Sequence, residues 1–314
     1  MQVAYDVRIE QSNRVCASPL AKRLALKANI AIAGIRGSGP RGRVLSKDVL
    51  ALATSNSRIT PSCDQVMKRP DDSLLNFFPD DSYSEIPHDE IRKIIARRLC
   101  EAKSTIPHFY LSLDCHIDEL LDLRAKLNSI APKSQDGQPA YKISVNDLVV
   151  KAYALALKTV PQANASWTEK AILYHNSADI GVAVSLPGGV ITPIVKDALN
   201  KPLSVLSNEI RLLSKLARNK KLKPEQYQGG TTVVSNLGMF GVKSFAAIVN
   251  PPHATILAVG AGTQQPVIVD GKIEIATVLT LTLSTDHRVI DGALAAELIR
   301  ATKSNLENPM SMLV

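Results

Sequence analysis

A histidine near the C-terminus has the neighbours that acid–base chemistry requires. His287 stands in the run DHRVIDG, flanked by Asp286 and Arg288 and followed four positions later by Asp291. The preceding residues 277–284 alternate apolar side chains with threonines, which is typical of a β-strand. The spacing therefore makes His287 a candidate base at the end of a strand, with a purely structural or solvated histidine as the alternative.

Three motifs, in the same order along the chain, resemble the acyltransferases of the 2-oxo acid dehydrogenase complexes. They are IPHFYL at residues 106–111, GGTTVVSNLGMFGV at residues 229–242 and STDHRVIDG at residues 284–292. The resemblance extends over residues 85–314. The motif SNLGMFG is most similar to the corresponding motif in the family members that serve the pyruvate dehydrogenase complex. It implies an α/β fold, a chloramphenicol-acetyltransferase-like two-layer sandwich with a mixed sheet, preceded by a small helical peripheral subunit-binding domain.

The resemblance also implies an activity. It is the transfer of an acetyl group from S-acetyldihydrolipoamide to coenzyme A, in a protein that also forms the core scaffold of the pyruvate dehydrogenase complex. Coenzyme A is then a substrate, and the lipoyl group is expected from a lipoyl domain outside these 314 residues. Two alternatives are succinyl or branched-chain acyl transfer in a related complex, and a non-catalytic scaffold that binds the dehydrogenase. Such scaffolds lack the active-site histidine, whereas the DHRVIDG motif is intact here.

Acetyl transfer to a thiol needs a base for the thiol proton and a hydrogen-bond donor for the tetrahedral oxyanion. A thiol with an ordinary pKa of about 8.5 is mostly protonated at neutral pH, and an imidazole can take that proton during attack. The resemblance assigns the base to His287 and the oxyanion donor to the hydroxyl of Ser235. From the sequence alone, Ser235 would be interpreted as a turn-capping hydroxyl.

Three further residues of the motif have expected roles. The resemblance gives Asp291 an orienting role, through a pair with an arginine of the IARRL segment at residues 95–99. Asp286 and Arg288 are expected to be structural.

The resemblance places the active sites between neighbouring subunits of a homotrimer, with His287 and Ser235 coming from different chains. Coenzyme A and the lipoyl arm would enter one channel from opposite ends. Trimers would then assemble into a 24-mer or a 60-mer core, and the sequence does not choose between these two assemblies.

The net charge of +8 is concentrated in one short segment. Residues 14–53 contain eight basic residues and one acidic residue, so this segment alone carries +7. A compact basic face is typical of a site that binds an acidic partner rapidly and with salt-dependent affinity. The segment resembles the peripheral subunit-binding domain of the family, which binds the dihydrolipoyl dehydrogenase component and, in some complexes, the pyruvate decarboxylase component. On that resemblance the partner-binding candidates are Lys22, Arg23, Arg41 and Arg43, and the alternative is a merely solvated basic face.

The same segment is short and mainly helical. Ser18 and Pro19 predict a helix start, and Ser46 predicts the cap of a second helix over residues 47–52. The glycine-rich turn between the helices at residues 37–44 does not follow a strand, so a dinucleotide-binding loop is rejected. Binding of nucleic acid is also rejected, because the pair of helices is hardly longer than one motif and has no aromatic residue.

Composition divides the chain into four parts. Residues 1–13 are predicted to be a linker remnant, 14–53 the peripheral subunit-binding domain, 54–83 a flexible linker rich in Ser, Asp and Pro, and 84–314 the catalytic acyltransferase domain. No apolar run approaches the ~20 residues that span a bilayer. The four cysteines have no metal-type spacing, so neither a membrane segment nor a metal site is expected. Bacterial cytoplasm and mitochondrial matrix both fit a chain with reduced thiols.

The large domain is predicted to alternate helices and strands. The expected elements are a helix before Pro107, a strand over 108–117, a helix over 118–129 capped by Asp118, a helix capped by Ser144, two strands over 179–195, a helix over 203–217, strands at 231–235, 254–259, 266–270 and 273–284, and a helix from 292. One decoy is dismissed. Lys170 lies in the tripeptide Glu-Lys-Ala, which is similar to the turn that carries lipoate in lipoyl domains. It is expected to be an ordinary surface lysine, because no small all-β unit surrounds it.

Overall fold

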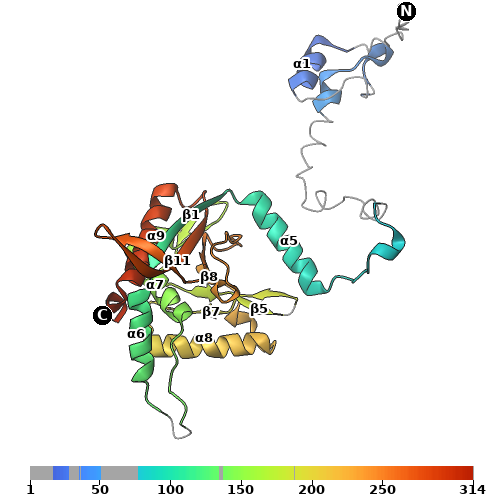
Figure 1. The fold of residues 1–314 in the computed structure, drawn as a ribbon. Helices are drawn as coiled ribbons and strands as arrows, with labels where there is room; N and C mark the ends of the chain where they lie inside the picture. The colour runs from blue at the N-terminus through green and yellow to red at the C-terminus, as the bar shows by residue number, and fades with distance from the viewer. Residues whose placement is uncertain are drawn as a thin grey trace, which may run out of the picture. The chain divides into compact units, whose positions relative to one another are not determined.

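The fold is taken from a computed structural model, which describes residues 17–27, 35, 37–50, 77–133, 137–186 and 188–313. The chain forms two compact units, Met1–Glu85 and Ile86–Val314, which are described separately (Figure 1). Most of the predicted linker over 54–83 lies outside the described residues, as do residues 1–13.

The small unit contains one helix whose start was predicted. Helix α1 (Pro19–Lys27) begins directly after Ser18, whose hydroxyl accepts a hydrogen bond from the Ala21 amide at 3.2 Å. This is the N-cap that the sequence predicted. The buried core of the unit is very small and consists of Ala21, Ala25, Ile35, Val44 and Val49.

The second helical stretch of the small unit begins differently from the prediction. Residues 46–50 are helical, so Ser46 lies inside the first turn and does not cap it. The carboxylate of Asp48 instead accepts the Leu45 amide at 3.0 Å and also binds the amide and hydroxyl of Ser38 at 2.9 and 2.6 Å. These hydrogen bonds lower the pKa of Asp48 to about 2. A carboxylate prevails over the hydroxyl here because it can satisfy several donors at once.

The large unit is built on a mixed sheet that helices cover. Its strands are β1 (His108–His116), β2 (Ala165–Trp167), β3 (Ile172–Tyr174), β4 (Ile180–Val182), β5 (Val184–Leu186), β6 (Gly189–Ile191), β7 (Ile194–Val195), β8 (Thr232–Asn236), β9 (Thr255–Val259), β10 (Thr263–Val269) and β11 (Lys272–Asp286). Its α-helices are α5 (Glu90–Thr105), α6 (Asp118–Ser129), α7 (Val145–Thr159), α8 (Leu203–Arg218) and α9 (Gly292–Glu307). Its short 3₁₀ turns are η4 (Pro161–Ala163), η5 (Pro224–Gln226), η6 (Gly238–Phe240) and η7 (Pro309–Leu313), while η2 (Pro40–Gly42) and η3 (Asp80–Ser82) belong to the small unit.

The main sheet has the order β1-β11-β9-β8-β4-β7, and β10 pairs with the first half of β11, residues 272–278. The pairs β4–β8 and β8–β9 are parallel, whereas β1–β11, β11–β9 and β4–β7 are antiparallel. The predicted mixed α/β architecture is therefore confirmed. No helix in the described part of the chain is both long enough and apolar enough to cross a bilayer.

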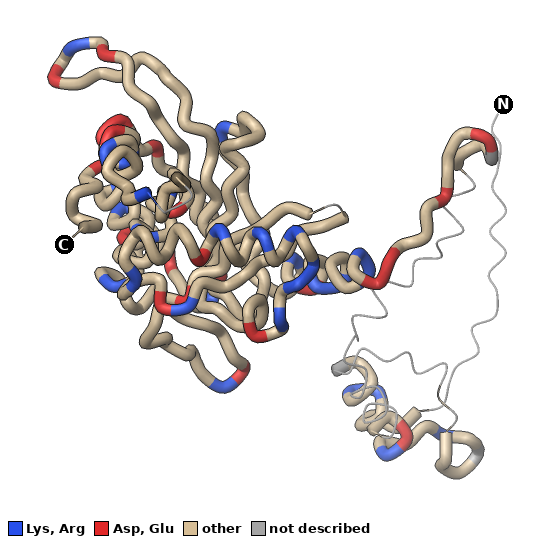
Figure 2. The backbone as a smooth tube through the Cα atoms, turned by 90° about the horizontal axis from the view of Figure 1, so that it is seen from below, with Lys and Arg blue, Asp and Glu red and all other residues tan. Residues whose placement is uncertain are grey.

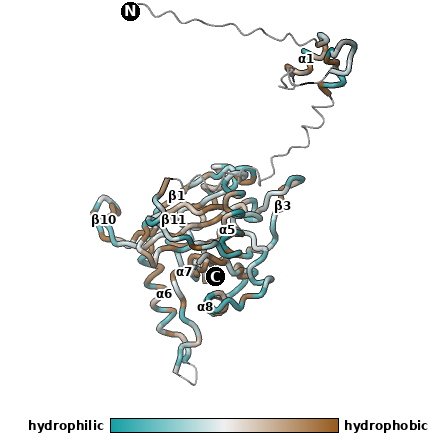
Figure 3. Tube along the Cα trace, turned by 90° about the vertical axis from the view of Figure 1, so that its right-hand side faces the viewer, coloured by the Kyte–Doolittle hydropathy of each residue, from teal (hydrophilic) through white to brown (hydrophobic). Residues whose placement is uncertain are grey.

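The two faces of the sheet differ in chemistry. Leu279, Leu281 and Leu283 of β11 belong to one buried cluster with residues of α7 and α9, so these helices cover the apolar face. Figure 3 shows the hydrophobic residues, in brown, along β1 and β11. Successive residues of a strand point to opposite faces. Thr280, Thr282 and Ser284 of β11 therefore point to the second face, where Thr282 contacts the Ser112 hydroxyl at 2.9 Å. The second face is the polar face of the sheet.

Two predicted elements were wrong in detail. Residues 179–195 form four short strands and not two, because β4 and β7 join the main sheet while β5 and β6 form a separate hairpin. Asp118 does not cap α6. It is the first residue of that helix, and its carboxylate accepts the Thr277 amide at 2.8 Å. The cap predicted at Ser144 is confirmed as a capping box with Asp147.

Candidate active site

His287 lies where the sequence placed it, immediately after the end of β11. Its backbone amide donates to the carbonyl of Pro107 at 3.0 Å. The ring of Phe109 packs edge-on against the imidazole, with 5.2 Å between ring centroids. The side chain of His287 is exposed in the single chain. The imidazole is therefore held on one side by β1 and is free on the other side to meet a reacting group.

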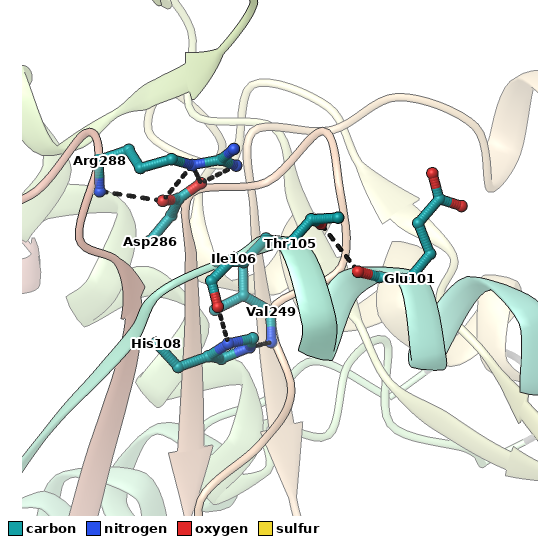
Figure 4. A network of polar contacts seen from close by, with 7 residues as sticks. All are labelled: Glu101, Thr105, Ile106, His108, Val249, Asp286 and Arg288. Carbon is teal, nitrogen blue, oxygen red and sulfur yellow. Dashed lines mark hydrogen bonds and ion pairs between the residues drawn. The ribbon is translucent and has the colours of Figure 1, made fainter. Parts of the chain in front are cut away.

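The two flanking charged residues form an ion pair. Arg288 Nη2 lies 2.8 Å from Asp286 Oδ2, and its Nε also donates to the same carboxylate at 3.0 Å (Figure 4). The Arg288 guanidinium lies over the indole of Trp167, 5.0 Å from the ring centroid. The hydrogen bond to Asp286 raises the pKa of Arg288 above its ordinary value. Only 3% of the Asp286 side chain is exposed, so the pair shapes the turn. That both residues have a purely structural role stays a prediction.

Asp291 caps the last helix. It is the N-cap of α9, and its carboxylate accepts the Leu294 amide at 2.8 Å. Within the described residues of one chain, no ion pair joins Asp291 to Arg97 or Arg98. The predicted arginine pair is therefore not formed inside a single chain.

Ser235 lies near the end of β8, at the start of a tight turn. The next residue, Asn236, accepts the Gly238 amide through Oδ1 at 2.8 Å and donates through Nδ2 to Asn146 Oδ1 at 3.2 Å. Gly241 closes the turn with φ 73°, a left-handed conformation that glycine adopts without strain. The predicted position of Ser235 at a strand–turn junction therefore agrees with the structure, and Asn236 provides the capping bond.

Strand pairing shows how far apart Ser235 and His287 lie. Ser235 pairs with Ala258 of β9, and Ala258 pairs with Thr282 of β11. Ser235 is therefore on the polar face, at the same level as Thr282 but two strands away from it, and Thr282 is five residues before His287. With about 3.3 Å per residue along a strand and about 4.8 Å between strands, the two Cα atoms are separated by about 20 Å. One chain cannot bring both side chains to one carbonyl carbon.

A cavity of about 240 Å³ lies next to the turn at residues 287–289, the histidine turn. Its lining includes Trp167, His253, Asp286 and Arg288, together with residues at the end of α5. The imidazole of His253 lies 2.9 Å from the Asn250 carbonyl and 3.1 Å from the Gly229 carbonyl, and burial lowers its pKa. The sequence did not single out Trp167 or His253, because their contacts join segments that are far apart in the chain.

Three of the four residues predicted to bind a partner have described side chains, and these lie on the surface of the small unit. Lys22, Arg23 and Arg43 are exposed, and the colouring of Figure 2 shows how basic this unit is. The backbone of Arg41 lies in η2, while its side chain lies outside what the structure describes. Lys170 is exposed in the turn between β2 and β3, as expected of a surface lysine.

Two family models match the chain. The model described as 2-oxoacid dehydrogenases acyltransferase (catalytic domain) matches residues 80–314, and the model described as e3 binding domain matches residues 15–50. The first match alone covers well over half of the chain.

Curated proteins are similar over nearly the whole chain. The dihydrolipoyllysine-residue acetyltransferase component of the pyruvate dehydrogenase complex of Rhizobium meliloti (strain 1021) is 54% identical, with 97% of this chain and 70% of that protein covered. Component 2 of the mitochondrial enzyme of Arabidopsis thaliana is 44% identical, with 96% of this chain and 55% of that protein covered.

Solved structures agree in fold. A dihydrolipoamide acetyltransferase of Azotobacter vinelandii, studied for the role of a serine, a histidine and an asparagine in catalysis, has a TM-score of 0.70 and 32% identity, with 76% of this chain and 98% of that chain covered. The cubic core of a pyruvate dehydrogenase multienzyme complex gives the same TM-score, identity and coverage. A probable dihydrolipoamide acetyltransferase of Listeria monocytogenes has a TM-score of 0.68 and 32% identity, with 73% and 96% covered.

Proposed function

The chain belongs to the 2-oxo acid dehydrogenase acyltransferase family, and on that premise we propose that each active site is built from two copies of the chain. His287 of one copy acts as the base, and Ser235 of the next copy donates a hydrogen bond to the oxyanion. The overall reaction is the transfer of an acetyl group from S-acetyldihydrolipoamide to coenzyme A. Coenzyme A is a substrate of this reaction.

The chemistry follows from the groups present. The imidazole of His287 removes the proton from the coenzyme A thiol as the sulfur attacks the thioester carbonyl carbon. The carbonyl oxygen becomes negatively charged in the tetrahedral intermediate, and the Ser235 hydroxyl donates to it. When the intermediate collapses, the bond to the lipoyl sulfur breaks, and the imidazolium returns its proton to that sulfur. Acetyl-CoA and dihydrolipoamide leave, and His287 is again neutral.

The Azotobacter vinelandii relative supports this assignment of roles. In that chain the serine lies 52 residues before the histidine, and the asparagine lies four residues after it. Ser235, His287 and Asp291 have the same spacing here. Aspartate replaces asparagine at the third position, and both residue types can cap a helix. We therefore propose that Asp291 orients the histidine turn by capping α9, and that a negative charge at this position is not required.

The single observation that carries the two-chain site is the register of the sheet. It holds Ser235 and His287 about 20 Å apart in one chain. A site that needs both groups must therefore be completed by a neighbouring copy. A homotrimer, in which each copy lends its serine to one neighbour and its histidine to the other, satisfies this requirement.

The test is complementation between two inactive variants. Chains with His287→Ala and chains with Ser235→Ala are co-expressed so that single assemblies contain both, and acetyl transfer from free acetyl-dihydrolipoamide to coenzyme A is measured. Alone, the first variant should lose about 10²–10⁴-fold in rate and the second about 10²–10³-fold. Mixed at equal amounts, they should recover about a quarter of the wild-type rate, because random pairing leaves about a quarter of the interfaces intact.

A matched control removes complementation by design. Chains that carry both substitutions, co-expressed with an equal amount of wild-type chains, also leave about a quarter of the interfaces intact and should give a similar rate. If the mixture of single variants stays at the residual rate of each variant alone, the histidine and the serine act within one chain and the proposal is wrong.

We propose that the small unit recruits a partner through its basic surface. Its match to an e3 binding domain supports this role, as do the exposed side chains of Lys22, Arg23 and Arg43. The proposed partners are the dihydrolipoyl dehydrogenase and pyruvate decarboxylase components, and a lipoyl domain is proposed to deliver the acetyl group to the large unit. Residues 54–83 are proposed to act as the tether between the two units.

The larger assembly and the compartment are proposed from the relatives. Homotrimers are proposed to build a core particle, and the likeness to a cubic core supports a 24-mer over a 60-mer. Relatives occur in bacteria and in plant mitochondria. The bacterial cytoplasm and the mitochondrial matrix are therefore the two proposed locations.

A further inference from the structure

The imidazole of His108 connects two segments near the histidine turn. His108 is the first residue of β1. Its Nδ1 lies 2.9 Å from the carbonyl oxygen of Ile106, and its Nε2 lies 3.0 Å from the backbone nitrogen of Val249. Figure 4 shows the ring lying between these two backbone groups.

The hydrogen-bond partners define the proton position on this ring. A backbone N–H can only donate, so Nε2 of His108 must present its lone pair to Val249. The single proton of the neutral ring is then on Nδ1 and is donated to Ile106. Both ring nitrogens are therefore engaged in the neutral form, and His108 has no proton-transfer role of its own.

The far end of this connection is well anchored. The side chain of Val249 is fully buried and packs in a cluster with Ala102 and Ile106, at the end of α5. Ile256 of β9, which pairs with Ser284 of β11, packs against the same cluster. The ring of His108 thus ties the start of β1 to a packed point on the polar face of the sheet.

Both chain neighbours of His108 contact His287. The carbonyl of Pro107 accepts the backbone amide of His287 at 3.0 Å, and the ring of Phe109 packs edge-on against its imidazole. A shift of His108 would therefore move the backbone contact and the ring contact of His287 together.

We propose that His108 is a positioning residue for the transfer reaction, which it serves by fixing the two residues that hold His287. This inference rests on the proposed role of His287 as the base. The bond to Val249 is the essential one, because it joins segments far apart in the chain, whereas the bond to Ile106 is local. A misplacement of about 1 Å in a catalytic group can lower a rate by about 10²-fold.

The test separates the two bonds by substitution. His108→Gln keeps an acceptor that can reach Val249, while His108→Asn is shorter and keeps only a donor for Ile106. We expect His108→Ala and His108→Asn to lower kcat by about 10- to 100-fold, with KM for coenzyme A nearly unchanged. His108→Gln should recover most of the lost kcat. The matched control is His116→Ala, an exposed histidine on the same strand, which should behave as wild type.

A double-mutant cycle with His287→Ala distinguishes positioning from a general structural role. If His108 acts through His287, adding His108→Ala to His287→Ala should lower kcat no further. Multiplicative losses, or a loss that follows the unfolded fraction in a thermal melt, would overturn the proposal. The His287→Ala single variant reports separately on the proposed function, because normal activity in that variant would reject His287 as the base whatever His108 does.

Discussion

The histidine turn and the turn that follows Ser235 at residues 236–241, the serine turn, lie at opposite ends of one sheet. The two turns are stabilised in different ways. At the histidine turn, Asp286 and Arg288 form an ion pair that is largely buried on the carboxylate side. At the serine turn, Asn236 supplies neutral hydrogen bonds to Gly238 and Asn146. Among the described contacts, no charged side chain braces the serine turn. The difference suits the chemistry, because a fixed carboxylate beside the serine would oppose the negative charge that develops on the carbonyl oxygen.

The largest effect is expected at the base itself. His287→Ala should lower kcat by about 10²–10⁴-fold while the assembly and its melting temperature stay unchanged, because the side chain is exposed in the single chain. Steady-state kinetics and sedimentation check both parts. His88→Ala, which removes another exposed histidine, is the control. An active His287→Ala protein would leave only the serine turn with a catalytic role.

The next effect tests the charged brace. Arg288→Ala removes the guanidinium that pairs with the buried carboxylate of Asp286 and leaves it the backbone amide of residue 288 at 3.0 Å, so the free energy of unfolding should fall by about 3–5 kcal/mol. Thermal or urea unfolding of the assembled protein measures this loss. Lys93→Ala removes an ion pair whose partners are 58% and 81% exposed, and it should cost less than about 1 kcal/mol. Equal losses in the two variants would show that the pair at the histidine turn is not a special brace.

A smaller effect is expected at the neutral brace. Asn236→Ala leaves the Gly238 amide and the Asn146 side chain without a partner, at a cost of about 1–2 kcal/mol in the free energy of unfolding. The rate of transfer should fall with it, because the turn that orients Ser235 loosens. The exposed Asn308 provides the control in an Asn308→Ala variant. A loss as large as that of Arg288→Ala would contradict the contrast between the two turns.

Hydrogen bonds accepted by a carboxylate should weaken in acid, whereas those made by an amide side chain should not. Asp48 of the small unit allows a test of this difference, with the smallest expected effect. Its pKa is about 2 in the folded chain against an ordinary 3.8. The charged carboxylate therefore stabilises the fold above about pH 4, and this contribution is lost as the pH falls toward 2. Amide exchange of residues 19–27 in the full chain should show a stability difference between wild type and Asp48→Asn above pH 4 that disappears near pH 2. A difference that does not depend on pH would show that the charge is not what matters.

The sequence predicted those parts of the site that depend on local pattern. The alternation of leucine and threonine predicted β11, and the motif after it placed His287 at the end of the strand. Glycine and asparagine after Ser235 predicted the turn there. The contact of His108 with Val249 spans 141 residues, and the stacking of Arg288 on Trp167 also joins distant segments. Such contacts could not be predicted, because each depends on where the sheet brings separate strands together.

Helix starts show the same limit on a smaller scale. Ser18 and Ser144 were correctly predicted as caps, but Ser46 and Asp118 were not caps. In the first case the nearby carboxylate of Asp48 satisfies the amides better than a hydroxyl. In the second, Asp118 binds the amide of Thr277, a strand residue that is remote in sequence. Local pattern therefore predicts that a helix begins, while the tertiary structure decides which side chain satisfies its first amides.

The separation of Ser235 and His287 within one chain has a consequence for the life of a newly made subunit. Both turns are held by residues of their own chain, so on the proposed two-chain site a folded subunit already carries two preformed half-sites that belong to different active sites. Such an isolated subunit would be folded but would not consume acetyl groups or coenzyme A. If the proposed two-chain site is correct, turnover begins only when copies associate, and the onset of activity then reports directly on particle formation.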